Sequence, residues 1–304
     1  MVSARIAVLQ QLVLLTLLPC SPLQAQLEEA SPDPLTVRLI TSDIPRFWAV
    51  LDRATSENLA ALLQREYLNA GTPGLQEFLS ISIGSADALA EAVESRRERY
   101  EEIRELSLNV DAAERAIRAP LYALEYLYPD AVFPDIYFVI GRLKSGGTAR
   151  GRGLFIGTEM FHNVEGLRSI VAHELIHFQQ LATGQYYAAA EAPSLLALAI
   201  LEGSADFLAE LISGIRGNPR AQEYGRAHER ELWAQFQLEM RGTDVDPWFY
   251  GNPPGERPAD LGYFIGYRIT EAYYEEATNK KQAIRDILTT RDFLKLLEQS
   301  GYGQ

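Results

Sequence analysis

Most apolar positions along the chain recur at intervals of three or four residues, which is the spacing of amphipathic helices. This pattern predicts helices at residues 41 to about 79, 85 to about 106, 111–128, 163–182, about 193–213, and over most of 258–297. Gly71-Thr72-Pro73-Gly74 interrupts the first of these segments, while Gly184 and Gly214 follow two later ones as C-terminal signals. We therefore expect a mostly helical protein.

Two short apolar runs break the helical pattern. Residues 135–141 and 153–159 are rich in β-branched and aromatic side chains and are bounded by Pro or Gly, so they are predicted to be buried strands. The glycine-rich segment 144–153 could suggest a phosphate-binding loop, but no Gly-Lys-Ser or Gly-Lys-Thr ending opens a helix after it. We expect a flexible hairpin or a rim loop there.

The N-terminus has the layout of a secretory signal peptide. Arg5 precedes an apolar run at residues 6–18, and a small-residue end at Ala25 predicts cleavage after that position. A membrane anchor is the alternative, but Gln10 and Gln11 interrupt the run, which is too short to span a bilayer comfortably. We expect export to the periplasm or the extracellular space, with no stable transmembrane anchor after cleavage.

A lipid anchor at Cys20 is a further alternative, although Pro19 fits a lipoprotein signal poorly. After the signal peptide, residues 1–25, we expect a linker at 26–40, an N-terminal helical part at 41–130 and a catalytic part at 131–304. The last two parts are expected to form one continuous domain.

The net charge and the cysteine content argue against several kinds of partner and functional site. The net charge of -13 becomes -14 once Arg5 is removed, and no long basic run offsets it, which argues against a nucleic-acid partner. Cys20 is the only cysteine, so the mature chain has no disulfide, no thiolate ligand and no cysteine nucleophile. Any metal ion must be held by nitrogen and oxygen.

The sequence His173-Glu174-Leu175-Ile176-His177 lies within the predicted helix 163–182. Residues four apart lie on one face of a helix, so the two histidines can ligate one zinc ion. Glu174 is rotated by about 100° from His173, toward the place where a zinc-bound water would lie. This geometry suits a carboxylate that acts as a general base.

A third ligand is expected on the next helix, because catalytic zinc usually has three protein ligands. Glu202 and Asp206 interrupt an otherwise apolar segment, where carboxylates are costly unless paired or metal-bound. We predict that Glu202 ligates zinc and that Asp206, one turn later, accepts the free N–H of His173. Gly203 would let this helix and the HExxH helix approach closely. The alternative is an ordinary polar stripe on an amphipathic helix.

These residues resemble the gluzincin metallopeptidases, in which the HExxH helix is followed by a helix carrying Glu-x-x-x-Asp. The chain is also similar to the exported predicted zinc-dependent proteases related to the gliding-motility lipoprotein family. That similarity rests on residues 137–148, 202–206 and 262–269. It implies an α+β, mostly helical, zincin-like domain with a small sheet above the HExxH helix. It also implies that Tyr263 or Tyr267 stabilises the oxyanion; the alternative is that both tyrosines only pack the C-terminal helix. No metzincin-type Gly-His continuation follows His177.

The remaining histidines are weaker candidates. His162 precedes the metal helix, where a rim or capping role is the simpler interpretation, and His228 lies in a charged helical segment, where solvent exposure is expected. His228 stays a distant candidate for a transition-state donor.

The resulting hypothesis is a Zn²⁺-dependent metallopeptidase acting on peptide or protein substrates. His173, His177 and Glu202 hold zinc, which activates a water, and Glu174 takes the proton from that water. One alternative is an exported, non-catalytic zinc-binding or assembly module, which would have no need for Glu174. Another is a zinc-dependent amidase acting on a non-peptide or cell-wall substrate.

Overall fold

The computed structural model describes residues 30–250 and 257–304, so the predicted signal peptide and Cys20 lie outside the described residues. Within these ranges the chain is mostly helical with one small mixed sheet, which confirms the predicted α+β class. Among the described helices, none combines the length and the apolar character needed to cross a bilayer.

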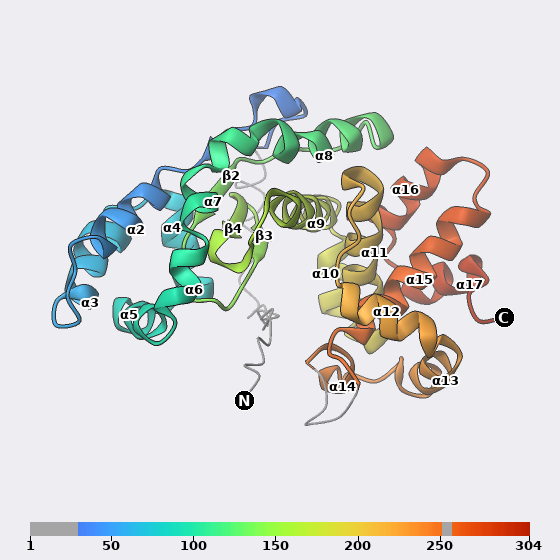
Figure 1. Ribbon diagram of the computed structural model, residues 1–304. Coiled ribbons are helices and arrows are strands. Elements are labelled where there is room, and N and C mark those ends of the chain that lie inside the picture. The colour runs from blue at the N-terminus through green and yellow to red at the C-terminus, as the bar shows by residue number, and fades with distance from the viewer. Residues whose placement is uncertain (1–29, 251–256) are drawn as a thin grey trace. The chain divides into compact units, whose positions relative to one another are not determined.

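The chain divides into two compact units (Figure 1). The first contains the described residues up to Ala119 together with Phe133–Glu174, and the second contains Pro120–Val132 and Leu175–Gln304. Two helices, α8 (Glu114–Leu127) and α9 (Val164–Ala182), run from one unit into the other. The boundary between an N-terminal helical part and a catalytic part, which the sequence suggests near residue 130, stays a prediction.

The first unit is built on a four-stranded sheet with the order β1-β2-β4-β3. Its strands are β1 (Leu39–Ile40), β2 (Ile136–Val139), β3 (Gly147–Arg150) and β4 (Gly153–Gly157). β2 pairs in parallel with both β1 and β4, whereas β3 pairs with β4 as an antiparallel hairpin at the edge. The two predicted strands are therefore confirmed as β2 and β4, the buried centre of the sheet.

The two outer strands were not predicted. β1 lies in the segment assigned to the linker, and two residues are too few to show a period. β3 lies in the glycine-rich segment, where Gly-Thr-Ala-Arg has no alternation of apolar and polar residues. The expectation of a hairpin there is correct, and pairing with the apolar strand β4 gives it its strand conformation.

Short helical elements pack around this sheet. They are η1 (Pro34–Thr36), α2 (Asp43–Leu51), α3 (Leu59–Leu62), η2 (Leu63–Leu68), α4 (Pro73–Phe78), η3 (Leu79–Ile83), α5 (Ala86–Ser95), α6 (Arg97–Glu102), α7 (Arg104–Leu108), η4 (Val110–Ala113) and η5 (Thr158–Met160). The helical segment predicted from residue 41 is broken at the expected point, since the Thr72 hydroxyl accepts the N–H of Leu75 and starts α4 with Pro73 in its first turn.

In the described residues of the second unit, all regular secondary structure is helical. Besides the ends of α8 and α9 it contains α10 (Gln185–Glu191), α11 (Leu195–Ser213), α12 (Pro219–Ala227), α13 (Glu229–Glu239), α14 (Asp246–Phe249), α15 (Leu261–Glu276), α16 (Lys280–Thr289) and α17 (Phe293–Ser300). α11 and α15 form its most extensive helix pair and lie side by side in Figure 1.

Two glycines permit the close approach of α11 and α15. A Cβ added at Gly203 would lie 2.1 Å from the backbone nitrogen of Tyr267, and one added at Gly266 would lie 1.6 Å from the carbonyl oxygen of Ala199. Gly203 does permit close helix packing, but the prediction named the wrong partner, because its Cβ position faces the backbone of α15 and not the HExxH helix. Because Glu202 precedes Gly203, this contact also determines where the predicted metal ligand lies.

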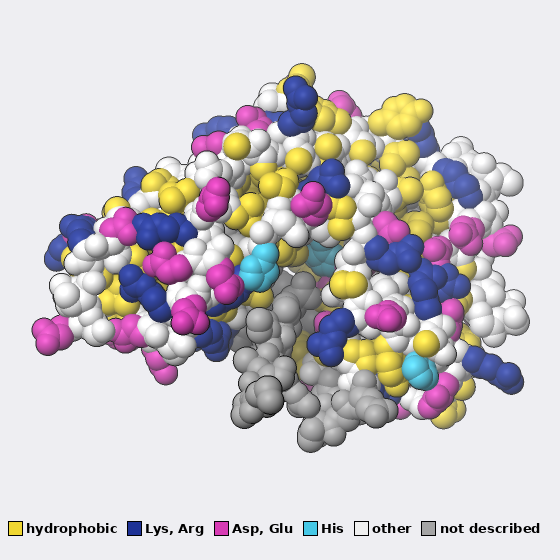
Figure 2. Space-filling view, viewed as in Figure 1, with side chains coloured by type: hydrophobic (Ala, Val, Ile, Leu, Met, Phe, Trp, Pro, Cys, Tyr) yellow, Lys and Arg dark blue, Asp and Glu magenta, His cyan; other side chains and the backbone are white. Residues whose placement is uncertain are grey.

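Charged side chains of both signs are interspersed on the face of the molecule shown in Figure 2. Neighbouring pairs such as Arg104 with Glu101 and Arg118 with Glu114 form ion pairs at 3.2 and 2.7 Å. Exposed pairs of this kind contribute little to stability, so the apolar core is the main stabilising contribution.

We predict that Gly266→Ala destabilises the protein by roughly 2 kcal/mol or more, because the added methyl group must push two helix backbones apart. Urea unfolding followed by circular dichroism would measure this change. A variant as stable as the wild type would contradict the close backbone contact.

Candidate metal centre

The HExxH residues lie on the buried helix α9. The side-chain oxygen of Asn163 accepts the N–H of Gly166 at 2.8 Å and caps the first turn. His173 and Glu174 are 6% and 3% exposed, and the His177 side chain is 11% exposed. Because the two histidines are one helical turn apart, both project from the same face.

α11 supplies the third residue. Glu202 Oε2 lies 3.2 Å from His177 Nε2. His173, His177 and Glu202 each offer one ligand atom, and these three atoms lie within 4.8 Å of one another. Two imidazoles and a carboxylate form one of the ligand sets found in catalytic zinc sites, so this cluster is able to hold a metal ion.

Gln180 determines which nitrogen of His177 carries hydrogen. The amide nitrogen of Gln180 donates to Leu201 O at 2.9 Å and to Ser204 Oγ at 3.0 Å, so its amide oxygen faces His177 Nδ1 at 2.7 Å. The imidazole must donate from Nδ1, so in its neutral form Nε2 carries a lone pair. That lone pair faces the Glu202 carboxylate, and two acceptors this close repel unless a proton or a metal ion binds between them. The residues therefore fit zinc.

Asp206 is buried one turn beyond Glu202 and is held by the segment that follows α11. Its Oδ2 accepts a hydrogen bond from Asn218 Nδ2 at 2.7 Å. Asn218 has a φ of 46°, in the left-handed region that asparagine tolerates better than most residues. The contact immobilises the Asp206 carboxylate. Its predicted bond to His173 stays a prediction.

Asp260 and Tyr263 extend the acidic character of this site. Burial, followed by the charges of Asp206 and Glu202, raises the pKa of Asp260 to about 7. Burial, the charges of Glu202, Asp260 and Asp206, and a hydrogen bond to Glu202 raise the pKa of Tyr263 well above its ordinary value. The Tyr263 hydroxyl therefore stays protonated, and the concentration of carboxylates favours a cation.

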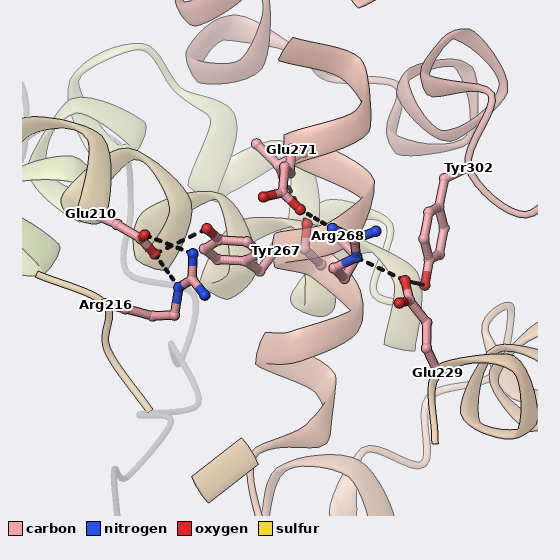
Figure 3. A network of polar contacts seen from close by, with 9 residues as sticks. Glu210, Arg216, Glu229, Tyr267, Arg268, Glu271 and Tyr302 are labelled. Carbon is pink, nitrogen blue, oxygen red and sulfur yellow. Dashed lines mark hydrogen bonds and ion pairs between the residues drawn. The ribbon is translucent and has the colours of Figure 1, made fainter. Parts of the chain in front are cut away.

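The two tyrosines predicted as oxyanion donors have different surroundings. The Tyr263 hydroxyl is near Glu202, as the effect of that carboxylate on its pKa indicates. The Tyr267 hydroxyl donates to Glu210 Oε2 at 2.9 Å, and the same carboxylate binds Arg216, whose guanidinium lies over the Tyr267 ring (Figure 3). The structure thus brings Tyr263 toward the metal residues and engages Tyr267 in a separate polar network.

Glu174 packs against the first residue of the edge strand β3. A Cβ added at Gly147 would lie 2.8 Å from Glu174 Cγ, 2.9 Å from its Oε1 and 3.0 Å from Ile170 Cγ1. Only glycine fits this position without displacement, and the sheet consequently rests directly on the HExxH helix. The backbone of β3 is thereby brought next to the predicted general base.

A family model covers the part of the chain that carries these residues. Residues 139–292 match the family described as "Predicted Zn-dependent protease (DUF2268)". The chain belongs to this family. Searches of the curated proteins and of the solved structures found no match. The family description and the buried cluster of two histidines and a glutamate agree on a zinc protease.

The two other histidines of this family member are exposed. His162 Nδ1 lies 2.7 Å from Arg99 Nη1, just before α9. His228 stacks on the Tyr224 ring at 4.1 Å and its Nδ1 lies 2.9 Å from Tyr224 O at the end of α12. His228 is exposed, as predicted, whereas His162 contacts Arg99 of α6, and the first turn of α9 is capped by Asn163.

Sequence reasoning missed Gln180 and Asn218. An amide three residues after a predicted histidine ligand was an available signal for Gln180, because such a side chain can reach back to the imidazole of His177 on the same helix face. No comparable signal existed for Asn218, which reaches Asp206 only through the path of the segment after α11.

We predict that Gln180→Ala lowers zinc affinity by roughly 10 to 100-fold, because His177 loses the acceptor that fixes its tautomer. Glu202→Ala, which removes a predicted ligand atom, should lower zinc affinity further. Gln179→Ala is the matched control: Gln179 bonds Val132 and Leu175 instead, so its loss should leave zinc affinity nearly unchanged. Competition titration with a fluorescent chelator measures all three, and equal affinities for the two glutamine variants would refute the assignment.

For the tyrosines we predict that Tyr263→Phe lowers kcat by about 10²-fold with little change in KM, as expected for a lost oxyanion donor. Tyr267→Phe should chiefly reduce stability, by about 1 kcal/mol, because it removes the hydrogen bond to Glu210. Peptide-hydrolysis kinetics and urea unfolding of both variants distinguish these effects. Two fully active variants would leave both tyrosines with packing roles only.

Proposed function

We propose that this protein is an exported, gluzincin-type zinc metallopeptidase that hydrolyses peptide bonds in peptide or protein substrates. The observation that carries the proposal is the Nε2 lone pair of His177 facing the Glu202 carboxylate, with His173 one turn away. Membership of a predicted zinc-dependent protease family supports it. Export is supported by the N-terminal sequence, and the gluzincin type by Glu202 and Asp206 on the helix after HExxH.

His173, His177 and Glu202 would hold the zinc ion. A zinc ion in such a site polarises a carbonyl oxygen and lowers the pKa of a water molecule. Asp206, fixed by Asn218, would accept a hydrogen bond from His173, as Gln180 does from His177.

Glu174 would move the protons of the reaction. It follows His173 directly on α9, and its side chain projects from a different face of the helix than the two histidines do. Its carboxylate would accept a proton from the attacking water and deliver it to the leaving amine. Burial of Glu174 among α9 and β3 limits its rotamers, so the carboxylate is held ready for this role.

The edge strand β3 favours a peptide as the substrate. In the described sheet only β4 pairs with β3, so the other side of β3 can accept an extended peptide by backbone hydrogen bonding. A peptide bound there would run past Gly147 and hence past Glu174. A non-peptide amide would make no use of a strand edge.

We predict that Glu174→Gln leaves the protein folded and zinc-loaded but lowers peptide hydrolysis by at least about 10² to 10⁴-fold, the contribution of a positioned general base. Glu165→Gln, an exposed change at the start of the same helix, is the matched control and should keep full activity. A peptide library, metal analysis and circular dichroism supply the measurements, and a chelator should inactivate the wild type until zinc is restored.

If the wild type and Glu174→Gln are equally inert on peptides but bind zinc and a partner protein equally well, the protein is a binding module. Hydrolysis of cell-wall amides alone, lost in Glu174→Gln, would identify an amidase instead.

A further inference from the structure

The segment 140–146, which connects β2 to β3, is held by three buried polar side chains of the first unit. The Tyr67 hydroxyl donates to Ile140 O at 2.6 Å and accepts the Ile140 N–H at 2.9 Å. The Tyr100 hydroxyl donates to Gly141 O at 2.9 Å. Glu159 Oε1 accepts the N–H of Leu143 at 3.3 Å. The metal site uses none of these three side chains.

Glu159 is unusual among them because a carboxylate is completely buried. Its exposure is 0%, and within the described residues its Oε2 has no hydrogen-bond partner. The Arg99 guanidinium binds the backbone carbonyl of Glu159 at 3.0 Å and His162 Nδ1 at 2.7 Å, rather than the carboxylate. Among the described residues, the carboxylate accepts hydrogen bonds only from backbone N–H groups, and burying it with Oε2 unpartnered costs free energy.

The backbone closes tightly around this carboxylate. A Cβ at Gly141 would lie 2.7 Å from Glu159 Oε1, and one at Gly157 would lie 3.1 Å from Oε2 and 2.4 Å from Ser145 O. Leu143 has a φ of 60°, a left-handed conformation that costs a leucine energy. Its N–H donates to Glu159 Oε1, so the carboxylate holds the strained residue in place.

The held segment leads directly to the predicted base. Ser145 Oγ donates to Gly147 O at 2.9 Å, and Gly157 N donates to Gly146 O at 3.1 Å, so the end of the segment is joined to β3 and β4. The next residue, Gly147, packs on Glu174. A shift of segment 140–146 would therefore move the strand edge past the carboxylate of Glu174.

We propose that Glu159 is a positioning residue, whose carboxylate fixes the segment 140–146 and thereby holds β3 against Glu174. Its importance for hydrolysis rests on the proposed peptidase function, whereas its hold on the segment does not. An ionised carboxylate accepts N–H groups more strongly than a protonated one. The hold on Leu143 is therefore expected to weaken when Glu159 takes up a proton.

The charge state of Glu159 changes near neutral pH. Burial raises its pKa to about 7, against the opposing effects of its bonds to the N–H groups of Gly141, Glu159 and Leu143 and of the Arg99 charge. The groups around it that titrate or carry charge are Arg99 and Tyr100 from α6, Tyr67 from η2, Arg142 in the segment, and His162 through Arg99. Histidine is the side-chain type that ordinarily titrates near neutral pH, so His162 needs its own control.

Protonation of Glu159 should raise the global stability of the protein, although it weakens the hold on Leu143. The pKa of Glu159 is higher in the folded protein than in the unfolded chain, so ionisation opposes folding, and stability is lost as pH rises from about 4.5 to about 7. Glu159→Gln, which cannot ionise, should match the wild type at pH 5 and melt a few degrees higher at pH 8. The same variant should hold Leu143 less firmly at pH 8. If Glu159 had only a structural role, replacing it would not raise the melting temperature of the protein while weakening the hold on segment 140–146.

The test is hydrogen–deuterium exchange of segment 140–146 in the zinc-loaded full chain, corrected for intrinsic exchange, between pH 5.5 and 8.5. In the wild type, protection of the Leu143 amide should fall as pH drops through about 7. In Glu159→Gln, exchange at pH 8 should be about 5-fold faster than in the wild type and nearly independent of pH. Glu159→Asp, which keeps the charge but shortens the reach, should also exchange faster, and His162→Gln should behave as the wild type.

Equal protection of the segment in the wild type and in Glu159→Gln at every pH would overturn the proposal. A pH-dependent transition that disappears in His162→Gln would overturn it as well, by assigning the titration to the histidine. Kinetics then test the link to catalysis: Glu159→Gln should lower kcat about 10-fold with zinc content unchanged. Should the wild type hydrolyse no peptide while the exchange difference persists, the proposed function fails and the hold on the segment stands.

Discussion

The candidate metal centre depends on one unfavourable contact, the lone pair of His177 Nε2 facing the carboxylate of Glu202. Gln180 cannot turn its amide to relieve the repulsion, because its nitrogen already donates to Leu201 and Ser204. Asp206 and Asp260 add further carboxyl groups: Asp206 lies on the mostly apolar helix α11, and Asp260 directly precedes α15. Such an arrangement needs a proton or a metal ion between His177 and Glu202, and the cluster is therefore able to hold a metal ion.

Close backbone packing makes this centre possible. Gly203 lies next to Glu202, and the contact of α11 with α15 at Gly203 and Gly266 leaves no space for a side chain. The same contact brings α15 near enough for Tyr263 to lie close to Glu202. One helix pair therefore determines the positions of the candidate metal ligand Glu202 and of Tyr263, and larger residues at either glycine would disturb both.

The edge of the sheet is held in place by buried polar side chains, whereas the metal residues are positioned by helix packing. Tyr67, Tyr100 and Glu159 bury their polar atoms against the backbone that leads into β3, where ordinary strand pairing does not reach. Buried hydrogen bonds of this kind are stronger than exposed ones and leave few alternative conformations. The glycine-rich composition, which by itself favours flexibility, is thus compatible with a fixed strand beside Glu174.

The sequence by itself determined the helical character, the two central strands and the identity of the candidate metal residues, because each depends on local spacing. Apolar periodicity is visible along the chain, and the His-Glu-x-x-His spacing places two imidazoles on one face of any α-helix. Only the tertiary structure decided the outer strands, the hydrogen-bond partner of His177 Nδ1, the different surroundings of Tyr263 and Tyr267, and the contacts of Asn218 and Glu159. Each of these rests on a contact between residues distant in the chain or on a backbone path, and local sequence carries no information about which distant groups a side chain will meet.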